Sequence, residues 1–155
     1  MVDNANKPIE EVGVRLVGVE LVELHTTPKS DFNFSNHEFA FKTEIECKLN
    51  KEKKWAMVTV GIDLQDNVSK RQLAQLKNMC VFEVQGFDSV IHLDADGRFN
   101  VDESLMALFN TVAYATTRGV MYSEFRGTYL HNAFLPLIPQ NIISGKESSG
   151  EKSDS

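Results

Sequence analysis

The chain has 155 residues, a formal net charge of −6 at pH 7, and 42% hydrophobic and 25% charged residues. This is the composition of a single soluble globular domain, and the negative balance argues against nucleic-acid binding, which needs clustered Lys and Arg to neutralise phosphates. No apolar run approaches the roughly 20 residues of a membrane span, and the polar first residues are unlike a signal peptide, so we expect a cytoplasmic protein.

The predicted organisation is one domain with two polar ends. We expect a flexible segment over residues 1–11, the domain over 12–143 and a disordered tail over 144–155, where Ser, Gly, Glu and Lys dominate. The two cysteines, Cys47 and Cys80, lie in strand-like segments. This predicts buried reduced thiols rather than a disulfide or a nucleophile.

Extended segments come first in the chain. Residues 12–25 are rich in Val and Leu, and their alternation slips near Gly18, which predicts a bulge. Residues 37–50 alternate apolar side chains with Glu and Lys, the pattern of an antiparallel strand with one wet face. A polar turn at 49–54 leads into residues 55–64, so these two segments should form a hairpin.

The fourth strand is predicted at residues 79–85 and should continue after Gly86 to Leu93. Between the third and fourth strands, the pattern of residues 66–78 fits either a helical turn or a solvated loop. We interpret it as a loop.

A long helix follows the strands. The pair Asn100 and Glu103 has capping-box spacing and should begin the helix, and Gly127 should end it. Residues 104–117 carry no charge. One face has core-packing spacing: Leu105, Leu108, Phe109, Val112, Ala113 and Thr116.

The opposite face of this helix is also apolar, with Ala107, Tyr114 and Met121 at heptad spacing. A helix that is apolar all round must be covered on both sides, and a short chain has little left to provide the second cover. We therefore expect these three residues to form an interface between copies of the protein.

Two short motifs carry a resemblance to a known family. The strand motif is Val81-Phe82-Glu83-Val84-Gln85-Gly86-Phe87, and the helix is closed by Arg126-Gly127-Thr128-Tyr129 before an apolar run that ends Leu135-Pro136-Leu137-Ile138-Pro139. In these features the chain resembles the SecB family of export chaperones over residues 12–139.

The resemblance implies an α+β, SecB-like fold: a four-stranded antiparallel sheet, then one long helix on one face and an apolar crossover loop. It also implies helices packed between protomers. The family's second helix is not predicted here, because residues 140–145 run directly into the polar tail. Dimer and tetramer therefore both stay open.

Function follows from the same resemblance. It implies an ATP-independent holdase that binds unfolded or export-bound polypeptides in a hydrophobic groove, with neither cofactor nor enzymatic activity. The groove residues would come from two connections: Phe32, Phe34, Tyr129, Leu130, Phe134 and Leu135. The family meets the SecA motor through strand positions that match Val81 and Glu83 here, with Glu20 as a looser match.

Two alternatives belong to other classes. One is a SecB-like interaction or assembly subunit, of toxin–antitoxin or phage origin, without an export role. The other is a hotdog-like acyl-thioester enzyme with Asp102 or Glu103 as its base, although a hotdog normally places its helix between the first strands.

Metal and nucleophile patterns are weak in this sequence. His92, Asp94, Asp96, Gly97 and Glu103 fall at EF-hand positions 1, 3, 5, 6 and 12, but position 1 lacks an anionic oxygen and a strand precedes the loop. A polar turn is the favoured interpretation, and calcium is the minor one. The four histidines lack zinc-site spacing, so no metal is expected.

Overall fold

The computed structural model describes residues 13–28 and 38–137. The predicted α+β class is confirmed, because four antiparallel strands come first and a long helix follows. The strands are β1 (Val14–Thr26), β2 (Phe39–Asn50), β3 (Trp55–Asp66) and β4 (Gln72–Val84), in the sheet order β1-β4-β3-β2. Then come α1 (Phe87–Val90), the hairpin of β5 (Ile91–Leu93) and β6 (Phe99–Val101), and α2 (Glu103–Phe125).

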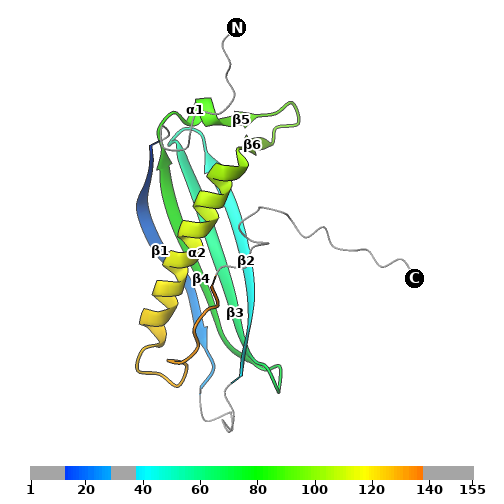
Figure 1. Cartoon of the computed structure of the whole chain (residues 1–155), viewed down its shortest axis with the longest axis vertical. Helices are drawn as coiled ribbons and strands as arrows, with labels where there is room; N and C mark the ends of the chain where they lie inside the picture. Colours follow the sequence, from blue (N-terminus) through cyan, green and yellow to red (C-terminus); the bar gives the residue numbers. More distant parts are fainter. Residues whose placement is uncertain (1–12, 29–37, 138–155) are drawn as a thin grey trace, which may run out of the picture.

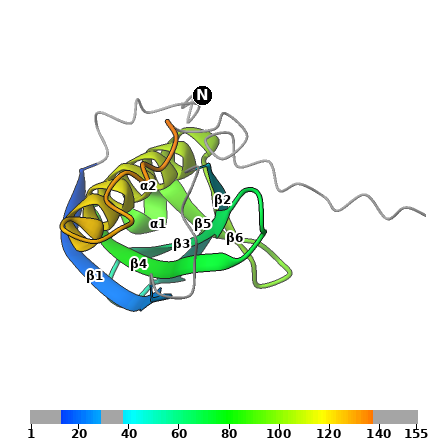
Figure 2. The same ribbon diagram turned by 90° about the horizontal axis from the view of Figure 1, so that it is seen from below.

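The domain has two layers. Helix α2 crosses one face of the sheet diagonally, and residues 126–137 return beside it (Figure 1). Figure 2 shows that both lie on the same face of the sheet, so no described element covers the other face. We call the covered side the inner face and the other side the outer face.

The core lies between α2 and the two central strands. Strand β3 alternates strictly, with Ala56, Val58, Val60, Ile62 and Leu64 at most 2% exposed. From the helix, Phe109 packs on Phe82 of β4 with ring centroids 5.1 Å apart. Burial of these side chains is the main stabilising contribution to the fold.

Several local predictions are confirmed. The register of β1 against β4 shifts between Leu16 and Gly18, as the broken alternation indicates, and shifts a second time between Leu21 and Glu23. Strands β2 and β3 form the expected hairpin, which closes at the pair Asn50 and Trp55.

The interpretation of residues 66–78 as a loop is wrong. Strand β4 begins at Gln72, so only residues 67–71 connect it to β3. The polar side chains Gln75 and Lys77 lie on the outer face, where they need no burial, and they hide the strand pattern. The buried Asn78 hides it further.

The predicted continuation of the fourth strand to Leu93 is also wrong. Gly86 takes a left-handed backbone conformation with φ 67°, which favours glycine and ends the strand. The short helix α1 and the separate strand β5 follow.

The helix does not begin with the expected capping box. Asp102 is the N-cap residue and makes no side-chain cap bond, whereas Asn100 belongs to β6 and pairs with His92. The helix begins at Glu103, so Asn100 lies two residues before the N-cap and is not the capping residue.

Both cysteines are free thiols. Cys80 is buried, and Cys47 on the edge strand β2 is half-buried. Burial disfavours the thiolate, so it raises the pKa of Cys47 to about 11 and also raises the pKa of Cys80. Neither thiol has the lowered pKa of a nucleophile.

The described part of the chain contains no helix with the length and hydrophobicity that a bilayer crossing needs. The predicted flexible segment over 1–11 and the predicted tail over 144–155 lie outside the described residues.

Candidate functional site

In the connection after α2, some of the predicted groove residues lie at the surface and others are buried. Leu130 and Leu135 are 0% and 1% exposed, so they belong to the core and cannot line an open groove. The expectation that these two residues line the groove is therefore wrong, because residues 126–137 fold back along α2 (Figure 1). Tyr114 holds the returning chain by donating its hydroxyl to the carbonyl oxygen of Pro136 at 2.7 Å.

Phe134 remains at the surface. Its ring stacks on Tyr122 of α2, with centroids 6.1 Å apart and planes 20° from parallel. Each of the two side chains is 56% exposed, and Leu137 beyond them is 77% exposed. The end of α2 therefore presents a stacked aromatic pair to solvent.

Tyr122 was not among the sequence-based candidates. The available signal is its position in the row Ser104, Thr111, Ala115 and Tyr122, which lies on the side of α2 away from the sheet. An aromatic residue in an otherwise small or polar row stands at the surface rather than in the core.

Tyr129 connects the loop to the first strand. It is half-buried and donates its hydroxyl to the carbonyl oxygen of Thr27, 102 residues away in the sequence. The crossover loop thus lies at the end of β1, where the connection that contains Phe32 and Phe34 begins. Those two residues lie outside the described residues.

The helix stripe expected to form an interface between copies is covered by the chain itself. Tyr114 and Met121 are each 1% exposed, and only Ala107 is half-buried. The premise that the chain cannot provide a second cover is wrong at Tyr114, which is buried and bonds the returning segment at Pro136. The interface between copies itself stays a prediction.

The three predicted partner-binding residues share the outer face of the sheet. Val81 pairs with Gly18, and Glu20 pairs with the next outer-face residue of β4, Met79. At the end of the same strand, Glu83 receives a hydrogen bond from Arg15 at 3.2 Å. The sheet thus gathers these positions, with Glu83 paired within the chain.

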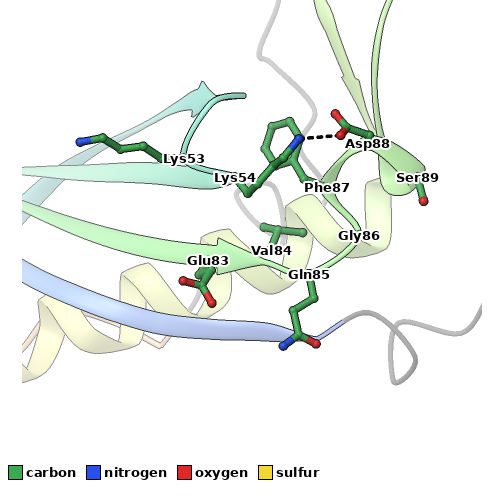
Figure 3. A pocket seen from close by; sticks show the side chains of 9 residues that line it. All are labelled: Lys53, Lys54, Glu83, Val84, Gln85, Gly86, Phe87, Asp88 and Ser89. Atoms are coloured by element: carbon green, nitrogen blue, oxygen red, sulfur yellow. Dashed lines mark hydrogen bonds and ion pairs between the residues drawn. The ribbon is translucent and has the colours of Figure 1, made fainter.

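A depression lies at the other end of the sheet from Phe134, beside α1. It has a volume of about 480 Å³, and Figure 3 shows its lining residues. Lys54 spans it to bond the Asp88 carboxylate at 2.5 Å, and this hydrogen bond lowers the pKa of Asp88. Glu83 and Gln85 point away from this ion pair (Figure 3). Since the pair satisfies its own charges, the depression offers little to a charged ligand.

Among residues 13–28 and 38–137, no group of three or more His, Cys, Asp or Glu side chains is arranged to hold a metal ion. In the EF-hand-like segment, Asp94 Oδ1 accepts the backbone N–H groups of Asp96 and Arg98 at 3.0 and 2.9 Å. This is the polar turn that the sequence favours.

The candidate bases of the hotdog alternative, Asp102 and Glu103, are both exposed at the start of α2. The helix also follows all four long strands, unlike the hotdog order. Neither residue lines the depression beside α1 or the neighbouring one of about 350 Å³.

Comparison with known proteins finds solved structures of similar fold. Over 81% of this chain and 90% of the other, the structure is similar to a SecB-like chaperone of Mycobacterium tuberculosis in complex with a peptide from an antitoxin, with a TM-score of 0.48 and 15% sequence identity. No protein-family model matches the chain. No curated protein matches it either. At this distance the neighbour's partner says nothing of what this chain binds.

Proposed function

We propose that the protein is an ATP-independent holdase chaperone of the cytoplasm that binds unfolded polypeptides through exposed apolar side chains. The stacked and exposed pair of Tyr122 and Phe134 is the observation that carries this proposal. Two large aromatic rings in solvent lose the stabilisation that burial would give them, unless a partner covers them.

The chemistry of this surface allows it to bind client segments of many different sequences. Aromatic rings provide a large contact area with few rotatable bonds, and they pack on any apolar side chain. No nucleotide is needed for such binding. Tyr129, and Phe32 and Phe34 in the neighbouring connection, would extend the surface from the end of α2 toward the end of β1.

The test is suppression of aggregation of a reduced, unfolded client protein in the absence of ATP. The double variant Tyr122→Ala and Phe134→Ala should need about fivefold or more protein for the same suppression, because truncating one interface anchor costs roughly 1 kcal/mol or more. Circular dichroism should show that the variant stays folded.

Leu93→Ala is the matched control, because Leu93 is 55% exposed but lies on β5, at the other end of the molecule (Figure 1). This variant should protect the client as well as the parent does. Equal protection by the aromatic double variant and the parent would exclude the surface as the client site.

A second candidate function is that of a dedicated interaction subunit that docks a folded partner on the outer face of the sheet. The observation in its favour is that Val81, Glu20 and Glu83 lie on the outer face, which no described element covers. SecA is the partner that the family resemblance suggests. Glu20→Lys with Glu83→Lys should weaken binding to purified SecA in calorimetry while client protection is unchanged, which separates the two functions.

A further inference from the structure

The charges around the exposed aromatic pair differ from those of the rest of the chain. The whole chain carries a formal net charge of −6, yet residues 104–137, which form most of α2 and the returning segment, contain two arginines and a single glutamate. The arginines are Arg118 and Arg126, and both are exposed. This part of an acidic protein is therefore locally basic.

The two arginines lie on either side of Tyr122 along α2. Arg118 is four residues before Tyr122, and residues at this spacing lie on the same side of a helix, one turn apart. Arg126 is the C-cap residue and follows Tyr122 by four residues. The glutamate, Glu124, is two residues from Tyr122, so it projects from the opposite side of the helix. The charges closest to the Tyr122 ring on α2 are thus positive.

Arg118 also lies near the segment that carries Phe134. Burial raises the pKa of Tyr114, and the nearby Arg118 guanidinium opposes this rise, because a positive charge favours the phenolate. The Tyr114 hydroxyl donates to the carbonyl oxygen of Pro136, two residues after Phe134. Arg118 therefore approaches both parts of the aromatic surface, the helix of Tyr122 and the returning segment of Phe134.

Neither arginine is neutralised within the described part of the chain. Among those residues, no carboxylate lies within ion-pair distance of Arg118 or Arg126. Other exposed cations are paired: Arg15 bonds Glu83, and Lys54 bonds Asp88. Both guanidinium groups at the aromatic surface thus keep their hydrogen-bond donors for a partner.

We propose that this surface selects client segments in which apolar side chains are flanked by Asp or Glu. The inference rests on the proposed function, since it names the clients that Tyr122 and Phe134 bind. The apolar side chains of the client pack on the two rings, and its carboxylates bind Arg118 and Arg126. Arginine suits this role, because its planar guanidinium can donate two hydrogen bonds to one carboxylate.

Charge acts here mainly on selection. Exposed ion pairs at the rim of a binding surface each add little affinity, but they favour partners of opposite charge and repel partners of the same charge. A segment flanked by lysines would bring like charges beside the two arginines. Clients with the same apolar residues are therefore separated by the charges that flank them.

Three labelled peptides test this selection by fluorescence anisotropy with the full chain. They share one apolar core and carry Glu, Ser or Lys residues on both sides of it. The Glu-flanked peptide should bind about fivefold more tightly than the Ser-flanked one, and the Lys-flanked peptide should bind most weakly. The differences should shrink as salt is raised, because salt screens exposed charges.

The double variant Arg118→Gln and Arg126→Gln should bind all three peptides within about twofold of one another, because it removes both cations. The matched control is Lys51→Gln with Arg98→Gln. It also removes two exposed positive charges, but these lie at the other end of the molecule, beside α1 and before β6. The control should keep the preference of the parent.

The outcomes separate this inference from the proposed function. If the parent binds the three peptides equally and the double variant Tyr122→Ala and Phe134→Ala loses them all, the surface binds clients without charge selection and the inference is overturned. A preference that survives the loss of Arg118 and Arg126 overturns it as well. Binding of all three peptides that is unchanged in the aromatic double variant would instead overturn the proposed client site.

Discussion

Strands β1 and β4 are equally long, with 13 residues each, and pair with one another, yet the chain uses them in opposite ways. The inner-face side chains of β4 are buried, whereas those of β1 are largely exposed. The difference comes from the helix, because α2 lies over β3 and β4 and has few contacts with β1. Apolar composition alone therefore does not make a strand part of the core.

Truncation of directly paired residues in the two strands should show the largest contrast. Phe82 of β4 is 2% exposed and pairs with Leu16 of β1, which is 41% exposed. Phe82→Ala should lower the free energy of unfolding by about 3–5 kcal/mol, because it leaves a cavity under Phe109.

Leu16→Ala should cost about 1 kcal/mol or less in dilute solution. Urea unfolding measures both changes. Equal costs for the two substitutions would contradict the contrast.

Loss of the buried hydrogen bond at the centre of β4 should have an intermediate effect on the free energy of unfolding. Asn78 is fully buried and donates its amide to Thr117 Oγ1 of α2 at 3.2 Å. Thr117→Val should cost about 1–3 kcal/mol in urea unfolding, because the amide then lacks this acceptor while still buried. Leu21 of β1 pairs with Asn78, and Leu21→Ala should lower the free energy of unfolding by less than Thr117→Val does.

The double variant Asn78→Val and Thr117→Val sharpens this result. It should be more stable than the sum of the two single effects predicts, because no buried polar group is left without its partner. Strict additivity would show that the hydrogen bond contributes nothing.

A pH-dependent effect is expected at the other edge strand, where Cys47 is half-buried. Its folded pKa is about 11 against an ordinary value of 9.0, so burial of the neutral thiol contributes stability that is fully present below pH 9.0 and is lost as the pH rises toward 11. The parent should lose more stability over this range than Cys47→Ala, as measured by urea unfolding at each pH. Parallel stability curves would rule out a buried neutral thiol.

The residue pattern predicted much of the fold but little of the surface. Strand β2 was found because its outer face is charged, and the first bulge of β1 was found because Gly18 interrupts an otherwise regular alternation. The beginning of β4 was missed because a strand in mid-sheet needs apolar side chains only on its covered face.

The candidate site was harder for a different reason. Leu130 and Phe134 are four residues apart in one irregular segment, and one is buried while the other is exposed. Only the path of the returning chain decides this, and no periodicity encodes it. The same path brings Pro136 onto Tyr114, whose spacing with Ala107 and Met121 indicates an interface between copies.

The strand order also determines the sequence of events during folding. The turns of β2, β3 and β4 close short loops, whereas Arg15 and its partner Glu83 are 68 residues apart. Closing the longer loop costs more chain entropy, so we expect the first strand in the chain to be the last to join the sheet. Until then β4 has an open edge of its own, and during synthesis this is the period in which the nascent chain is most exposed to wrong pairing.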